Sequence, residues 1–126
     1  MKTITRWKKK HEFESWQDQH SILIDGSRQH GISPKALLLC GLAGCSGVDV
    51  VDILTKMRVD FSELEIDVET TQTEENPRVF RDIHITYKLK TTNACLLLHN
   101  IAGTIRLFNH FIYQITKIKI FRFVIT

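Results

Sequence analysis

Cysteine and proline are scarce in this 126-residue sequence, which contains 3 cysteines and 2 prolines. A small and odd number of cysteines argues against a disulfide framework and favours reduced thiols in a reducing compartment. Hydrophobic residues make up 43% of the chain and charged residues 25%, a composition that excludes a disordered tail or a collagen-like repeat. A chain of this length can bury a core without metals or disulfides. We therefore expect one domain spanning residues 1–126.

Long hydrophobic runs and a signal peptide are also lacking. The longest charge-free run in the first half, residues 36–48, would rise only about 20 Å as a helix, short of the roughly 30 Å hydrocarbon layer. The N-terminal residues MKTITRWKKKHEFE lack an apolar stretch followed by a small-residue cleavage site. These absences predict a cytoplasmic protein with no membrane partner.

Acidic residues are absent after Asp82, and residues 1–10 carry five basic residues with no acid. A cluster of cations is one feature of nucleic-acid-binding proteins, because it releases counterions from phosphate. No nucleic-acid-binding motif accompanies this cluster, and lysines commonly solvate a strand end or a turn. We therefore expect Lys8–Lys10 to be a solvated turn and expect no nucleic-acid partner.

Three short N-terminal segments are rich in β-branched or aromatic residues and are separated by polar stretches. They are Thr3–Trp7, Glu12–Trp16 and Ser21–Asp25. This pattern predicts three strands of a small antiparallel meander. The following Asp25-Gly26-Ser27 predicts a turn after the third strand.

A long helix is predicted from Pro34 to about Met57. Ser33 can accept a hydrogen bond from a free N–H group of the first turn, and proline at the first helical position has no N–H to leave unpaired. Apolar residues surround the whole circumference between Ala36 and Val51. This distribution predicts a central core helix that is enclosed on all sides.

The second half of the chain predicts a hairpin, a helix and a final strand. Glu63–Thr71 and Val79–Leu89 alternate apolar and charged residues, which is typical of half-buried strands, and residues 73–77 supply the turn. Asn93–Phe111 is interpreted as a second helix and Ile115–Ile125 as a final strand. Together with the first helix, these antiparallel strands predict an α+β fold.

Cys45 is the candidate nucleophile, because its small neighbours on the helix let a substrate approach the sulfur. Gly41, Gly44 and Gly47 recur every third residue, and each costs up to about 1 kcal/mol of helix stability relative to alanine. We expect a close backbone approach to offset this cost. A thiolate needs a nearby cation or a helix N-terminus to stabilise it. The alternative for Cys45 is a buried cysteine that acts as a small hydrophobe.

The six histidines do not predict a metal site. His11, His20 and His30 lie on different predicted strands or loops, without HxxxH or CxxC spacing. We interpret all six as surface or structural residues and expect no bound metal.

Residues 33–58, SPKALLLCGLAGCSGVDVVDILTKMR, closely resemble the core helix of the osmotically inducible protein C (OsmC) and organic hydroperoxide resistance family. The predicted hairpin, with ENPRVF at residues 75–80 and IHITY at 83–87, and the opening Arg6-Trp7 resemble the same family. The likeness covers residues 1 to about 90. It implies antiparallel sheets packed on a long core helix, a second helix, and an intertwined homodimer with a thiol site at its interface.

The resemblance also implies a reaction. In the family, the cysteine that matches Cys45 attacks the O–O bond of an organic hydroperoxide, releases an alcohol and becomes a sulfenic acid. A second cysteine then forms a disulfide with it, and an external dithiol restores both thiols. No cofactor is implied beyond this reductant.

Two elements of the family site are missing. The glutamate that the family places nine or ten residues before the reactive cysteine is Ala36 or Lys35 here. Ten helical residues span about 15 Å, so Lys35 cannot reach Cys45 along a regular helix. Arg6, Arg28 or a cation of a partner chain would have to stabilise the thiolate instead.

The second missing element is the resolving cysteine, which the family places roughly sixty residues after the reactive one. Cys95 lies some fifty residues after Cys45 and is interpreted as an apolar residue at a helix start. Cys40 is rotated by about 140° from Cys45 on a regular helix, which excludes pairing between them within one helix. An active protein would therefore use Cys45 alone, with an external thiol.

Residues 91–126 do not resemble the family, and their lack of acids suggests an altered C-terminus such as a frameshift. A natural reading frame that runs intact through these residues would contradict that hypothesis. Two functions remain: hydroperoxide reduction through Cys45, or a catalytically impaired dimer that binds a small apolar molecule or a lipid.

Overall fold

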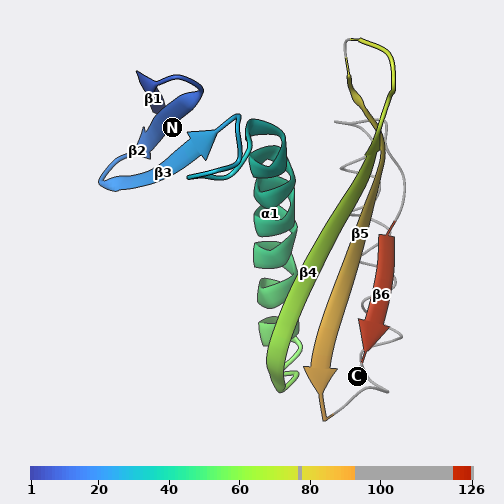
Figure 1. Cartoon of the computed structure of the whole chain (residues 1–126). Helices are drawn as coiled ribbons and strands as arrows, with labels where there is room; N and C mark the ends of the chain where they lie inside the picture. Colours follow the sequence, from blue (N-terminus) through green and yellow to red (C-terminus); the bar gives the residue numbers. More distant parts are fainter. Residues whose placement is uncertain (77, 93–120, 126) are drawn as a thin grey trace. The chain divides into compact units, whose positions relative to one another are not determined.

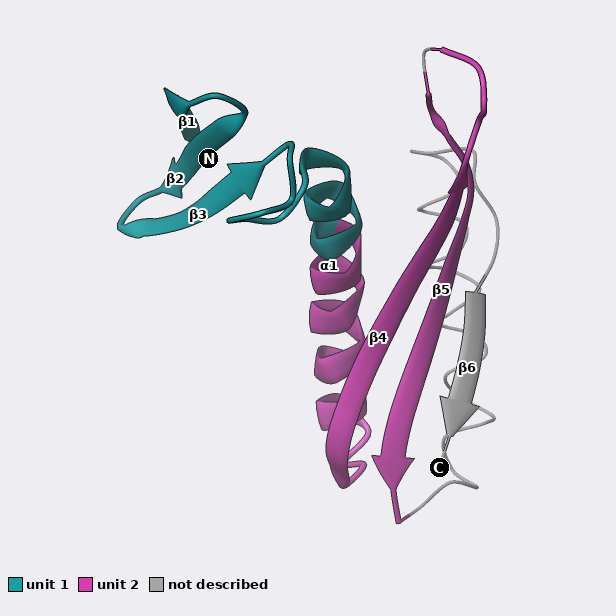
Figure 2. Ribbon diagram, in the orientation of Figure 1, with its two compact units in different colours: residues 1–41 teal, residues 42–126 magenta. Residues whose placement is uncertain are grey.

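The computed structural model describes residues 1–76, 78–92 and 121–125. Six strands and one helix occur there in the order β1, β2, β3, α1, β4, β5, β6 (Figure 1). The chain divides into two compact units, Met1–Gly41 and Leu42–Thr126, and the boundary falls within the helix (Figure 2).

The N-terminal unit contains a three-stranded antiparallel sheet in the order β1-β2-β3. The strands are β1 (Ile4–Lys9), β2 (Glu12–Gln17) and β3 (His20–Asp25), so the predicted meander is confirmed to within a few residues at each boundary. The register places Trp7, Phe13 and Ile24 in one cross-strand row. This row of the small sheet is therefore apolar, and 65% of the Trp7 surface is exposed in the single chain.

Helix α1 spans Pro34–Lys56, as predicted. The Ser33 hydroxyl accepts a hydrogen bond from the Ala36 N–H at 3.3 Å, and the Ser33 carbonyl accepts the first helical bond from Leu37. This is the expected N-cap arrangement, with Pro34 at the first helical position.

The C-terminus of α1 is closed by two backbone hydrogen bonds. Val59 N–H donates to the Leu54 carbonyl and Arg58 N–H donates to the Thr55 carbonyl, both at 3.0 Å. This pattern is a Schellman motif, and its apolar contact joins Val59 to the fully buried Leu54. Arg58 occupies the left-handed position, with a φ of 53°, where glycine is usual.

Replacing Arg58 by glycine is therefore expected to stabilise the protein. A non-glycine residue in the left-handed region costs roughly 1–2 kcal/mol, part of which the larger unfolded-state entropy of glycine cancels. We expect the free energy of unfolding to rise by about 0.5–1 kcal/mol for Arg58→Gly in urea denaturation. Arg58→Val, which is β-branched, should lower it, and the opposite order of these two variants would contradict the motif.

Helix α1 is not enclosed on all sides, so this prediction was wrong for the single chain. Only Ser46 and Leu54 are buried, whereas Leu38 and Val48 are 67% and 63% exposed. The reason is that α1 packs its C-terminal half against one sheet only, through a core cluster that includes Leu54, Val59 and Leu89. The opposite apolar face has no partner among the described residues.

The helix glycines differ from one another in their surroundings. A Cβ added at Gly47 would lie 2.9 Å from Cδ1 of Ile66, so at this position the helix does approach the sheet closely. A Cβ added at Gly41 or Gly44 would meet nothing within 4 Å. The expected close approach is therefore present at Gly47. Gly41 and Gly44 lie, with the exposed Leu38 and Val48, on the face of α1 that has no partner among the described residues, which we call the open face.

By length and composition alone, α1 could cross a membrane. The expectation of no membrane span rested on residues 36–48 alone, whereas the helix has 23 residues and a rise of about 35 Å. That expectation was wrong as far as length is concerned, because the length of α1 does not exclude a span. The core helix of a soluble protein meets the same criterion.

The second unit contains a long antiparallel hairpin of β4 (Phe61–Gln72) and β5 (Phe80–Thr91), as predicted. Strand β6 (Phe121–Ile125) adds to β5 in parallel (Figure 1), so this sheet is mixed. The predicted helix over 93–111 and the first part of the predicted last strand, residues 115–120, lie outside the described residues. The α+β fold class is confirmed.

The hairpin buries one face and exposes the other. Ile83, Ile85, Tyr87 and Leu89 of β5 are each at most 7% exposed. On the outer face, Lys88 Nζ lies 2.6 Å from Glu65 Oε1 and also pairs with Asp67. Hydrogen bonds to Asp67 and Glu65 raise the pKa of Lys88 above its ordinary value. The alternation read from the sequence therefore separates a core face from a charged face.

Gly31 lies against β3 in the loop that leads to α1. An added Cβ would lie 2.6 Å from the Leu23 carbonyl oxygen, and the neighbouring Ile32 pairs with Ile24 in a parallel bridge. Because the clash is with backbone, the loop or the strand must shift in Gly31→Ala. We expect a loss of about 1–3 kcal/mol in the free energy of unfolding, measured by urea denaturation. Gly26→Ala should lose less, because its nearest contact is the His11 side chain at 3.3 Å.

Candidate thiol site and the polar network before the helix

Cys45 lies on the open face of α1. Its thiol is free and exposed, and so is that of Cys40. The next residue, Ser46, is fully buried, and one helical step rotates the side chain by about 100°, so Cys45 projects away from the face that packs on the sheet. The alternative of a buried cysteine acting as a small hydrophobe does not hold in the single chain. An exposed thiol beside open glycine positions is accessible to a reagent or a partner.

A buried polar pair lies beneath this turn of the helix. The Ser46 hydroxyl donates to the Ala43 carbonyl at 3.0 Å and also hydrogen-bonds Tyr87 of β5. Tyr87 is 2% exposed, and its burial raises the pKa of its hydroxyl above the ordinary value, while the Ser46 hydrogen bond partly offsets this rise. The pair fixes the rotation of α1 on the sheet, with Ser46 inward and Cys45 outward. Neither residue was predicted from the sequence as part of the site.

The other cysteines do not provide a resolving thiol within the described residues. Cys40 and Cys45 are both in the regular helix α1, where five residues rise about 7.5 Å. A disulfide needs Cα atoms closer than about 7 Å, so the pair cannot bridge within one chain. Cys95 lies outside the described residues.

Lys35 lies in the first turn of α1, about 15 Å of helix rise from Cys45. It therefore cannot stabilise the Cys45 thiolate from within its own helix. Arg6 lies on β1, and Arg28 lies in the loop before α1 with a φ of 61°. Both arginines belong to the N-terminal unit.

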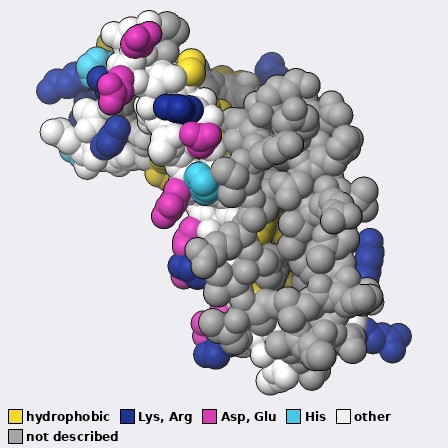
Figure 3. Space-filling model, turned by 90° about the vertical axis from the view of Figure 1, so that its right-hand side faces the viewer, with side chains coloured by type: hydrophobic (Ala, Val, Ile, Leu, Met, Phe, Trp, Pro, Cys, Tyr) yellow, Lys and Arg dark blue, Asp and Glu magenta, His cyan; other side chains and the backbone are white. Residues whose placement is uncertain are grey.

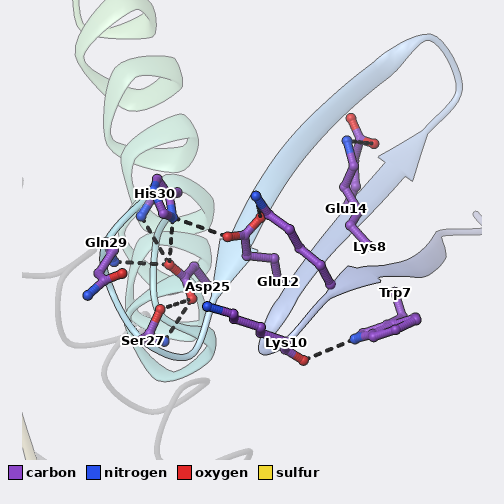
Figure 4. A network of polar contacts seen from close by, with 10 residues as sticks. Trp7, Lys8, Lys10, Glu12, Glu14, Asp25, Ser27, Gln29 and His30 are labelled. Carbon is purple, nitrogen blue, oxygen red and sulfur yellow. Dashed lines mark hydrogen bonds and ion pairs between the residues drawn. The ribbon is translucent and has the colours of Figure 1, made fainter.

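Asp25 organises the loop between β3 and α1, which is the main polar network of the described structure (Figure 4). Its side chain is fully buried. Oδ1 accepts hydrogen bonds from Ser27 N–H at 2.8 Å and Ser27 Oγ at 2.6 Å, and Oδ2 accepts from the N–H groups of Gln29 at 2.9 Å and His30 at 3.0 Å. Two buried oxygens thus receive four hydrogen bonds.

This network holds the pKa of the Asp25 carboxyl far below its usual range. The Ser27 hydroxyl and the His30 backbone N–H are the largest causes, and burial opposes them only in part. The turn was predicted from the sequence, but the role of Asp25 was not. The pattern that could have predicted this role is an aspartate at the end of a strand, followed by Gly-Ser. Its side chain can accept a hydrogen bond from the backbone N–H two residues later.

Acidic partners neutralise part of the N-terminal basic cluster. Lys8 Nζ pairs with Glu14 at 3.2 Å, and Lys9 Nζ lies 3.8 Å from Glu12. On the face shown in Figure 3, acidic, basic and histidine side chains of the described residues are interspersed. The described surface of that face therefore carries no continuous basic field of the kind that binds phosphate.

Comparison with known proteins identifies the sequence relatives. The profile of the family described as OsmC-like protein matches residues 25–101. Protein YhfA of Escherichia coli K12 is 40% identical over 67 residues, which are 52% of this chain and 50% of that protein. Protein YhfA of Shigella flexneri matches with the same values. The chain thus spans about half the length of these curated relatives.

Solved structures share the fold at low sequence identity. A hypothetical protein from Aquifex aeolicus VF5 matches with a TM-score of 0.80 at 20% identity, covering 99% of this chain and 95% of that one. An OsmC-like protein from Mycoplasma pneumoniae matches with a TM-score of 0.78 at 17% identity, covering 99% and 94%. These likenesses establish the fold, and the sequence match over more than half of the residues establishes the family: this chain belongs to the OsmC-like protein family.

Proposed function

We propose that this protein reduces organic hydroperoxides with Cys45 as the attacking thiol, as the family resemblance implies. The observation that carries the proposal is the position of Cys45, a free and exposed thiol on the unpartnered face of α1. A structural cysteine in a core would instead be buried. The missing glutamate and resolving cysteine leave one reactive thiol, which an external dithiol must recycle.

The proposed cycle balances with these two reactants. The Cys45 thiolate attacks one peroxide oxygen, the O–O bond breaks, and the alkoxide takes a proton and leaves as an alcohol. Sulfur loses two electrons and becomes a sulfenic acid. One thiol of the reductant then displaces water to form a mixed disulfide, and its second thiol releases Cys45 and forms the oxidised reductant. No other cofactor takes part.

We further propose that a second copy of the chain packs on the open face of α1 beside Cys45, so that the thiol lies in a cleft at the interface, where the hydroperoxide enters. Leu38 and Val48 are exposed there, and the positions of Gly41 and Gly44 leave room for a close approach. An apolar face of this kind marks an interaction surface. A lipid environment suits the helix less well, because its other face is packed on a sheet and it carries Asp49 and Asp52. We therefore propose that the protein is a homodimer in the cytoplasm, without a membrane or nucleic-acid partner.

Sedimentation equilibrium tests the dimer. The wild type is expected to be dimeric at micromolar concentration, and the double variant Leu38→Glu/Val48→Glu is expected to be monomeric. Glu65→Gln, on the outer face of β4, is the control and should not change the mass. A monomeric wild type would contradict the homodimer.

Chemical trapping tests the reactive thiol. The protein is treated with cumene hydroperoxide in the presence of dimedone, which adds to sulfenic acids, and the adduct is located by mass spectrometry. We expect the adduct on Cys45 and an unchanged yield in Cys40→Ser. An adduct on another cysteine, or none, would contradict the proposal. A Cys45 that stays unmodified would favour the alternative function, binding of a small apolar molecule or a lipid.

A further inference from the structure

Three side chains that can bind metal converge in the N-terminal unit, apart from the thiol. Glu12 lies on β2, Asp25 ends β3, and His30 lies in the loop before α1 (Figure 4). Each offers one donor atom, and these atoms all lie within 4.8 Å of one another. His30 Nδ1 is 3.1 Å from Glu12 Oε1 and 3.9 Å from Asp25 Oδ2. This group was not predicted from the sequence, because its members come from separate segments with no motif spacing.

The burial of both carboxylates points to a cation at this place. Glu12 is 8% exposed and Asp25 is fully buried, so two negative charges lie close together away from water. Burying like charges is costly unless a cation balances them. The Lys9 side chain, which is 68% exposed, is only a loose partner for Glu12 at 3.8 Å. The nearer partner of Glu12 is the His30 imidazole at 3.1 Å, which balances a charge only when it is protonated.

The donor spacing fits one bound ion. Donors that bind a transition metal at about 2.0–2.2 Å lie roughly 3–4 Å from one another around it. The distance from His30 Nδ1 to Glu12 Oε1, 3.1 Å, falls in this range, and the Asp25 carboxylate lies 3.9 Å from the same nitrogen. The His30 side chain is 60% exposed, so the ion can reach the site and retain water ligands.

Asp25 differs from Glu12 and His30 because the acceptor positions of its carboxylate oxygens are already occupied by hydrogen bonds. Its oxygens already accept four hydrogen bonds, from Ser27 N–H, Ser27 Oγ, Gln29 N–H and His30 N–H. A direct bond to a metal would have to displace one of them. We therefore assign Asp25 the role of a fixed negative charge beside the ion.

We propose that Glu12 and His30 bind a divalent first-row transition-metal ion, with the buried Asp25 carboxylate as its counter-charge. A mixed imidazole and carboxylate donor set suits ions such as Mn²⁺, Fe²⁺ and Zn²⁺. The ion would tie the β1–β2 hairpin to the loop that leads into α1. The site does not depend on the reaction proposed for Cys45.

Paramagnetic broadening by Mn²⁺ tests the site, because this ion has little affinity for the thiols. The ¹⁵N-labelled full chain is titrated with less than one equivalent of Mn²⁺. We expect the amide signals of Glu12, Asp25 and residues 27–31 to broaden first. Preferential broadening at the exposed acidic residues Glu63 and Glu65, or uniform broadening, would overturn the proposal.

Variants locate the ligands. His30→Gln is expected to weaken Mn²⁺ binding about tenfold or more, and since His30 is mostly exposed this change should leave the fold intact. His20→Gln, another exposed histidine of the same unit, is the matched control and should bind as the wild type does. Lys9→Ala should bind at least as tightly, because a competing cation is removed. Undiminished binding in His30→Gln would overturn the assignment.

Discussion

Replacing Cys45 by serine is expected to abolish hydroperoxide turnover. A hydroxyl in place of the thiol is a far weaker nucleophile at neutral pH and cannot form the sulfenic acid. The rate of cumene hydroperoxide consumption with a dithiol should therefore fall by at least about 100-fold, to that of the dithiol alone. A stopped assay that follows the peroxide directly measures this loss.

Cys40→Ser is the matched control for this prediction. Cys40 is also a free and exposed thiol of α1, but it is rotated by about 140° from Cys45. Its replacement should leave the rate within about twofold of the wild type, because a one-thiol cycle does not use it. Turnover that survives in Cys45→Ser and disappears in Cys40→Ser would transfer the reaction to the other thiol.

The second large effect is expected for Asp25→Ala. This change leaves the N–H groups of Gln29 and His30 and the Ser27 hydroxyl without their buried acceptor. Unpaired buried donors are costly, so we expect the thermal midpoint to fall by about 10 °C or more. Asp18→Asn, in the exposed turn between β2 and β3, is the control, because asparagine tolerates the same left-handed backbone.

The lowered pKa of the Asp25 carboxyl also predicts how the stability of the protein depends on pH. Its pKa in the folded protein lies below the ordinary value of 3.8. The contribution of Asp25 to the free energy of unfolding is therefore fully present when the pH is above 3.8. It is lost as the pH falls below about 3.8 towards the folded pKa, because the unfolded chain then binds a proton that the folded chain does not. Urea midpoints measured from pH 7 to pH 2.5 should fall more steeply in the wild type than in Asp25→Asn. Parallel curves would contradict this contribution.

The local sequence pattern was sufficient to predict most of the described helix and strands. Alternation between charged and apolar residues located β4 and β5, and Ser33-Pro34 located the start of α1 within one residue. These signals work because they depend on side-chain periods and on hydrogen bonds within a few residues of one another. The parallel pairing of β6 was not predicted, because it depends on the path of the chain between distant residues.

The candidate site was predictable only in part. The helix and the glycine, cysteine and serine at its centre are readable as a family pattern, which identified Cys45. The exposure of Cys45 could not be predicted. When apolar residues surround a helix, the sequence does not show which of them a second sheet or a second chain covers. The hydrogen bond between Ser46 and Tyr87 joins positions that the sequence separates by a whole hairpin strand.

The sequence by itself determined most of the described helix and strands, the family and the choice of Cys45 as the candidate thiol, because each depends on local spacing or on matched motifs. Only the tertiary structure decided which face of α1 is open, that Asp25 is buried beneath four hydrogen bonds, and that Glu12 and His30 meet beside it. Burial and convergence are properties of segments that are distant in the chain. They arise when hydrophobic faces pack and bring polar groups together out of water.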